Sequence, residues 1–283
     1  MVRVTKRMLR RATAGLIALA LLAVGAVYVA MPDKVEPTPE QEALLRRDTF
    51  EAPTGRIATV SAGEVDAPRI IYVHGTPGDS SNWLGYLLDP APGWTSIALD
   101  RPGFGGSGPE GHVAALAEQA AAIEPLLVER AGVKPILVGH SLGAPIIAKA
   151  AARYPDRVGG LLIIAGSMDP ELEQWRWYNR VGGLFEPLLS RSLRNSNREL
   201  RPLKDELLVL QDELDDIRCP VVIVHGTDDS LVPYKNVDYM IAHMTGARVE
   251  LIRLEGVDHF LIWNRVFDIH DAFRTLVGML REG

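Results

Sequence analysis

The chain is short of cysteine, of metal-binding motifs and, beyond its first residues, of positive charge. Cys219 is the only cysteine, so no intramolecular disulfide can form. It heads an apolar run, which predicts a buried small side chain. No cysteine pair and no His-Glu-x-x-His pattern is present, so neither a metal nor another cofactor is predicted. The sequence also lacks internal repeats and low-complexity tracts. Disulfide-stapled, zinc-dependent and repeat architectures are therefore excluded.

Basic residues are concentrated at the start of the chain. The first 31 residues contain five of the 30 basic residues and no acidic residue, so residues 32–283 hold 25 basic against 36 acidic residues, a net charge of −11. Nucleic-acid binding needs a basic face that displaces counterions. The balance argues against a nucleic-acid partner and is typical of a soluble, self-repelling surface.

Residues 12–31 contain no charged side chain and follow the basic cluster directly. About 20 apolar residues can span a bilayer, and flanking positive charge stays on the cytoplasmic side. The sequence therefore predicts that residues 1–31 anchor the protein in a membrane, with the rest of the chain on the exported side, periplasmic or extracellular. The alternative is a signal peptide cleaved near residues 24–26 (Val-Gly-Ala), which would leave a secreted protein.

Residues 32–54 include four prolines and many charges, and are interpreted as a tether. The rest, residues 55–283, suits one large domain. It alternates short β-branched runs with amphipathic stretches, the pattern of a mostly parallel sheet covered by helices. Strands are expected at 56–60, 69–73, 95–99, 135–138, 160–164, 221–224 and 249–254, and helices near 81–88, 112–131, 142–154, 236–244 and 264–281.

An insertion interrupts this alternation at about residues 167–214, after the strand expected at 160–164. It contains aromatic and leucine residues among charges, which indicates two or three short helices. Placed at the carboxyl ends of the strands, it would form a small helical cap over the site. A surface elaboration with its own small core is the alternative.

Ser141 is the central residue of Gly-His-Ser-Leu-Gly at 139–143, between an expected strand and an expected helix. A strand, a tight turn and a helix in this order form a nucleophile elbow, which presents the serine at its tip. Glycine is expected at 139 and 143 because strand and helix pass too close for larger side chains. Ser141 is therefore the candidate nucleophile.

A serine nucleophile needs a base, and the base needs an acid that orients it. In this type of sheet both follow the serine, in the order acid and then histidine. His259 follows the strand at 249–254 and is the histidine whose place and order fit. Asp229 follows the strand at 221–224 and is preferred as the acid over Asp228, and Asp258 is expected to be a local loop ligand.

Backbone N–H groups must also stabilise the negative charge that develops on the substrate oxygen. One donor is expected to be the N–H of Leu142, directly after the nucleophile. The other is assigned to Thr76, in the loop His-Gly-Thr-Pro-Gly at 74–78, where glycines let the backbone approach a substrate.

Five segments in this order resemble the α/β-hydrolase superfamily: 74–78, 100–108, 139–143, 226–229 with Pro233, and 256–259. The resemblance implies an eight-stranded, mostly parallel sheet, of which seven strands are recognised above, with a first edge strand within 50–68. It also implies that 100–108 is a structural turn without a catalytic role. Members that open epoxides or remove halide use aspartate at the elbow, so Ser141 argues against those reactions.

The resulting hypothesis is a serine esterase that cleaves a carboxylic ester or related small acyl compound through an acyl-enzyme intermediate. Apolar residues of the insertion, such as Leu184 and Leu188, would suit a lipid-like acyl chain, although they equally suit a core. Amide or aminopeptidase chemistry, carbon–carbon bond hydrolysis and perhydrolysis stay open within the same fold. A non-catalytic binding module is the contrasting alternative.

Overall fold

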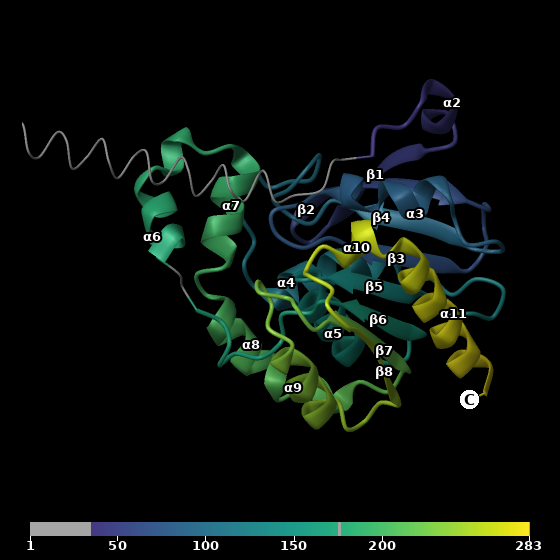
Figure 1. The fold of residues 1–283 in the computed structure, drawn as a ribbon. Helices are drawn as coiled ribbons and strands as arrows, with labels where there is room; N and C mark the ends of the chain where they lie inside the picture. The colour runs from purple at the N-terminus through teal and green to yellow at the C-terminus, as the bar shows by residue number, and fades with distance from the viewer. Residues whose placement is uncertain (1–34, 175–176, 283) are drawn as a thin grey trace, which may run out of the picture.

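The computed structural model describes residues 35–174 and 177–282. An eight-stranded sheet in the order β1-β2-β4-β3-β5-β6-β7-β8 lies at its centre (Figure 1). Strands β3 to β8 run parallel, and β2 is antiparallel to both of its neighbours. The strands are β1 Arg46–Ala52, β2 Gly55–Gly63, β3 Arg69–Val73, β4 Thr95–Leu99, β5 Ile136–His140, β6 Gly160–Ile164, β7 Val221–Gly226 and β8 Val249–Leu254.

The prediction of an eight-stranded, mostly parallel sheet is confirmed. All seven strands expected from their apolar runs are present. The central strands β4 to β7 are buried along their whole length, because helices cover both faces of the sheet. Their sequences are therefore mostly apolar and do not alternate between apolar and polar residues.

Strand β1 corrects the predicted tether over residues 32–54. Residues 46–52 pair with β2 in antiparallel register and form the edge of the sheet, so the tether prediction is wrong for this segment. Most of this strand is exposed, and its sequence is charged rather than apolar. Edge strands carry charge that discourages pairing with other chains, which is why the segment lacks a strand pattern.

Helices cover the sheet in two layers with separate cores. One core joins α4, α5, α8 and α9, and the other joins α3, α10 and α11. Cys219 is buried in the first core, as predicted, and burial raises the pKa of its thiol to about 12. The helices are α2 Pro39–Glu42, α3 Leu84–Leu88, α4 Leu116–Ile123, α5 Gly143–Arg153, α6 Trp177–Leu184, α7 Arg191–Glu199, α8 Leu203–Gln211, α9 Lys235–His243, α10 Leu261–Asn264 and α11 Val266–Glu282.

Helix α4 is much shorter than the helix expected at 112–131. It ends at Ile123 and continues only as the 3-10 turn Glu124–Leu126. Pro125 has no N–H group to donate, and its ring clashes with the preceding turn of an α-helix. The favourable alanine and glutamate content of the segment does not outweigh this block.

The insertion between β6 and β7 contains α6, α7 and α8. Helix α8 packs on the main core through Leu203, Leu207 and Leu210. Helices α6 and α7 stand off from the sheet (Figure 1), and Leu184 and Leu188 at the end of α6 and beyond are 78% and 82% exposed. The insertion thus contains a helix that shares the domain core, α8, and a projecting part, α6 with the turn that follows it. Helix α7 lies between them and is buried against the turn after β4 through Asn195 and Glu199.

The predicted anchor at 1–31 lies outside the described residues. Within the described ranges, no helix combines the length and apolar character needed to cross a bilayer.

Candidate active site

Ser141 sits in a left-handed backbone conformation, with φ +54°, between β5 and α5. A side chain costs about 1–3 kcal/mol in this region, so surrounding contacts must hold it there. The Ser141 N–H donates to the Ile164 carbonyl at 3.0 Å, and the Ser141 carbonyl accepts from the Ala144 N–H at 3.0 Å. Ser141 is half-buried, so the turn leaves it accessible.

The two glycines flanking the turn have no room for a side chain. A Cβ on Gly143 would lie 2.3 Å from the Val73 carbonyl oxygen, and one on Gly139 would lie 2.6 Å from the Gly143 carbonyl oxygen. Both obstacles are backbone atoms that cannot swing aside. The close passage of strand and helix expected at 139 and 143 is therefore present.

Asp229 and His259 form a buried hydrogen-bonded pair. The distance from His259 Nδ1 to Asp229 Oδ2 is 2.7 Å, and the two side chains are 8% and 0% exposed. Asp229 follows β7 and His259 follows β8, so the carboxyl ends of adjacent parallel strands bring them together. Gly226 allows the two loops to approach, because a Cβ there would lie 2.1 Å from the Val257 carbonyl oxygen.

The second oxygen of Asp229 accepts two backbone hydrogen bonds. The N–H groups of Leu231 and Val232 donate to Oδ1 at 2.9 and 2.7 Å. Burial by itself raises the pKa of Asp229, but hydrogen bonds from His225 and His259 outweigh it and lower the pKa well below its usual range. Asp229 is therefore a carboxylate and an acceptor for the His259 N–H.

The other two aspartates considered from the sequence point elsewhere. Asp228 is exposed. Asp258 accepts the Phe260 N–H at 2.9 Å, as expected of a local loop ligand. Of the three, Asp229 is the aspartate hydrogen-bonded to His259.

His140 supports His259 in a way that its sequence position does not reveal. Its Nε2 donates to the His259 carbonyl oxygen at 3.1 Å, and the two ring centroids are 4.8 Å apart. The Trp263 ring meets the His140 ring edge-on, with the ring centroids 5.6 Å apart. Burial, aided by repulsion from His259, lowers the pKa of His140 to about 3, so its ring is neutral near pH 7. Only the three-dimensional contact identifies this role, since the position lies inside a motif that tolerates many residues.

His140 should make the fold acid-sensitive. Its pKa is about 3 when folded and about 6.5 when unfolded. The unfolded chain therefore binds the additional proton between these values, and stability falls as pH falls through that window. We expect the free energy of unfolding of His140→Gln, whose amide can still donate to the His259 carbonyl, to fall less steeply with pH than that of the wild type. The difference in slope is up to about 1.4 kcal/mol per pH unit. Urea unfolding of both full-length proteins at pH 7.0, 5.5 and 4.5 measures this, and parallel slopes would contradict it.

The loop at 74–78 lies directly against Ser141. A Cβ on Gly75 would be 2.9 Å from Ser141 Cβ and 3.4 Å from Ser141 Oγ. Leu142 precedes the first residue of α5, so its N–H belongs to the helix end that lacks intrahelical partners. The predicted N–H donors of Thr76 and Leu142 thus come from segments that border Ser141.

The geometry joins some of the predicted residues by hydrogen bonds and leaves others only adjacent. Asp229 and His259 share a hydrogen bond. The His259 carbonyl accepts a second one from His140, the residue directly before Ser141. Within the described part of the chain, no hydrogen bond links the Ser141 hydroxyl to His259. Such bonds are often long in unliganded enzymes and tighten when substrate binds.

The turn at 100–108 is held by Asp100. Its two carboxylate oxygens accept the N–H groups of Ser80 and Gly106, each at 2.7 Å. This use of the carboxylate fits the structural role that the resemblance implies. In the described ranges, no cluster of three or more His, Cys, Asp or Glu side chains could hold a metal ion.

Comparison with known proteins agrees with this architecture. Residues 68–201 match the family model described as the alpha/beta hydrolase fold. A dihydrolipoyllysine-residue acetyltransferase component of the acetoin cleaving system from Cupriavidus necator is 35% identical over 100 residues, which are 35% of this chain and 26% of that protein. A pimeloyl-[acyl-carrier protein] methyl ester esterase from Vibrio campbellii is 27% identical over 205 residues, 59% of this chain and 79% of that protein.

The chain thus spans only about a quarter of the first of these relatives. Among solved structures, a membrane phospholipase A is similar with a TM-score of 0.64 at 19% identity, over 97% of this chain and 100% of that one. At this identity the likeness concerns the fold alone. The family match over residues 68–201 and the order and direction of the eight strands show that the chain has the α/β-hydrolase fold.

Proposed function

We propose that this protein is a serine hydrolase that cleaves a carboxylic ester, with Ser141 as nucleophile, His259 as base and Asp229 as the orienting acid. The observation that carries the proposal is the buried 2.7 Å hydrogen bond between His259 and Asp229, beside a serine in a strained elbow. Structural ion pairs also occur in cores, but this pair lies at the strand ends where Ser141 lies.

In the first step the Ser141 oxygen attacks the substrate carbonyl carbon while His259 Nε2 takes the hydroxyl proton. Asp229 accepts from Nδ1, which keeps Nε2 free as the proton acceptor and stabilises the imidazolium that forms. The carbonyl oxygen becomes negatively charged, and the N–H groups of Thr76 and Leu142 stabilise it.

The tetrahedral intermediate then collapses. The bond to the leaving group breaks, and the His259 imidazolium returns its proton to the departing oxygen. A water molecule next attacks the acyl carbon while His259 takes its proton. The bond from the acyl group to the Ser141 oxygen then breaks, His259 returns the proton to that oxygen, and the acid product leaves. All proton transfers use side chains of this chain, so the proposal includes no cofactor.

The substrate class we propose is a small acyl compound, with a carboxylic ester preferred. The Vibrio campbellii relative is described as a methyl ester esterase, which supports ester chemistry in this family. The exposed Leu184 and Leu188 on the projecting part of the insertion favour an apolar acyl group if this part serves as a cap.

We also propose that residues 12–31 anchor the domain to a membrane on its exported side, with secretion after cleavage as the alternative. Support comes from the uncharged run that follows five basic residues. The acidic remainder of the chain, which cannot form an intramolecular disulfide, is compatible with an exported domain whether the segment is retained or cleaved.

Activity-based labelling tests these proposals together. A fluorophosphonate probe is applied to the membrane and soluble fractions of cells that express the full chain, followed by a panel of esters of increasing acyl length and matched amides. We expect labelling in the membrane fraction and faster turnover of esters than of amides. Labelling confined to the soluble fraction would contradict the anchor, faster amide turnover would assign an amidase, and a folded but unlabelled protein would contradict the hydrolase.

A further inference from the structure

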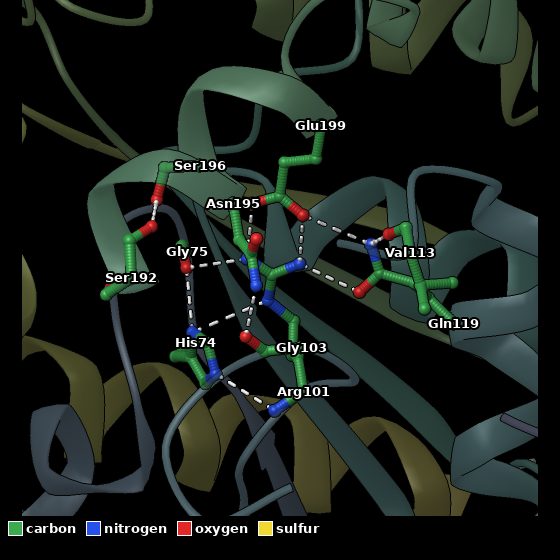
Figure 2. Close-up of polar contacts among 10 residues, drawn as sticks. All are labelled: His74, Gly75, Arg101, Gly103, Val113, Gln119, Ser192, Asn195, Ser196 and Glu199. Atoms are coloured by element: carbon green, nitrogen blue, oxygen red, sulfur yellow. Dashed lines mark hydrogen bonds and ion pairs between the residues drawn. The ribbon is translucent and has the colours of Figure 1, made fainter. Parts of the chain in front are cut away.

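Arg101, in the turn at 100–108 that follows β4, and Glu199, on helix α7 of the insertion, form a buried ion pair. Arg101 Nη2 lies 2.9 Å from Glu199 Oε1, and Nη1 lies 2.9 Å from Oε2, in a two-pronged contact (Figure 2). Each side chain is only 1% exposed. Taking two charges out of water is expensive, and such a pair often adds no net stability over apolar packing. Its presence therefore calls for a role besides stability.

The remaining contacts of the guanidinium give it a fixed orientation. Nη1 also donates to Gln119 Oε1 at 2.8 Å, and the group lies 4.6 Å from the centre of the Phe104 ring. Nη2 donates its second hydrogen to the Gly75 carbonyl oxygen at 3.0 Å. A planar guanidinium bound on several sides cannot shift toward one partner without losing another.

The Gly75 carbonyl accepts a second hydrogen bond from His74. His74 Nε2 accepts the Arg101 backbone N–H at 3.0 Å, which places the imidazole proton on Nδ1. Nδ1 then donates to the Gly75 oxygen at 2.7 Å. Arg101 therefore acts on this carbonyl in two ways. Its guanidinium donates to the oxygen directly, and its backbone N–H fixes the tautomer of His74, which donates to the same oxygen.

The peptide unit that contains this carbonyl also contains the Thr76 N–H. The Gly75–Thr76 bond is trans, and in a planar trans peptide the C=O and N–H bonds point in opposite directions. Holding the carbonyl against Arg101 therefore turns the N–H away from Arg101. Gly75 also borders Ser141, so the orientation of this peptide controls which group the loop presents to the substrate oxygen.

We propose that Arg101, held by Glu199 from α7, is a positioning residue that fixes the Gly75–Thr76 peptide with its N–H directed into the oxyanion hole. The inference rests on the proposed function. It makes α7 of the insertion part of the apparatus that sets the reaction rate, independent of any contact between α7 and substrate.

The test is the double variant Arg101→Met/Glu199→Leu in the full chain. Replacing both partners by apolar side chains leaves no unpaired buried charge. Loss of one oxyanion donor costs about 10²–10³-fold in kcat. Because His74 still contacts the carbonyl, we expect a kcat reduced by roughly 10- to 100-fold with KM within about twofold, and an equally slower fluorophosphonate reaction, since the donors act in the transition state.

Arg198→Met/Glu186→Leu is the matched control. This pair joins the same helix α7 to the preceding turn at 2.6 Å and does not contact the loop at 74–78. We expect its kcat to equal the wild-type value. Equal losses in the two double variants would mean that loosening the insertion is sufficient, and would overturn the proposal.

Rates are expressed per labelled site, which separates this inference from the proposed function. A wild-type chain without fluorophosphonate labelling would contradict the hydrolase itself. A labelled, folded Arg101→Met/Glu199→Leu with wild-type kcat would overturn only the positioning role. If the double variant does not fold, Arg101→Lys serves instead, because an ammonium keeps the charge beside Glu199 but cannot reproduce the fork to Gly75. Wild-type kcat in folded Arg101→Lys overturns the proposal equally.

Discussion

Replacing Ser141 by alanine is expected to lower the turnover of short p-nitrophenyl esters by at least roughly 10⁴-fold and to abolish fluorophosphonate labelling. The proposed reaction forms a covalent bond to the Ser141 oxygen, and only oxyanion stabilisation and substrate binding would remain without it. Alanine keeps the Cβ that borders Gly75, and the backbone hydrogen bonds of the turn do not involve the hydroxyl. The variant should therefore fold normally.

Thermal unfolding of Ser141→Ala beside the wild type verifies the fold. Ser230→Ala is the matched control, because Ser230 is exposed in the loop next to Asp229 and its hydroxyl has no part in the proposed chemistry. It should keep wild-type activity. Undiminished ester turnover in Ser141→Ala would show that another residue is the nucleophile.

The second large effect is expected for Asp229→Asn, with kcat lower by roughly 10³–10⁴-fold. The N–H groups of Leu231 and Val232 already occupy one oxygen of Asp229. In the variant the amide oxygen would take that position, so the NH₂ group would face His259 Nδ1. His259 would then carry its proton on Nε2 and could not accept one from Ser141.

Asp228→Asn and Asp258→Asn are controls for Asp229→Asn. Asp228 is exposed, and Asp258 accepts a single backbone N–H that asparagine can also bind. Both should stay within a few-fold of wild-type kcat. A larger loss in either of them than in Asp229→Asn would move the role of the acid to that residue.

Strong local signals allowed much of the fold to be predicted from sequence. The buried strands of a parallel sheet are mostly apolar, so β3 to β7 were recognisable, and the order of the motifs along the chain placed Ser141, Asp229 and His259 at strand ends. The hydrogen bond between Asp229 and His259 agrees with that placement. Their catalytic roles stay predictions until the variants above are measured.

Two parts of the fold were not readable from local patterns. Strand β1 is charged and exposed, and it is a strand only because β2 offers it a partner. Helix α4 ends early because of Pro125, a single residue in a segment whose composition otherwise favours helix. In both cases one steric or pairing constraint overrides average propensity.

Local sequence patterns predicted seven of the eight strands, the elbow with its two glycines and the candidate residues at the strand ends, because apolar periodicity and turn chemistry act between neighbours along the chain. The tertiary contacts added the hydrogen bond between Asp229 and His259, the support of that histidine by neutral His140, and the ion pair of Glu199 with Arg101, 98 residues away, whose guanidinium holds the Gly75 carbonyl. These contacts join distant segments, and their energies depend on burial and orientation, which a linear pattern does not encode.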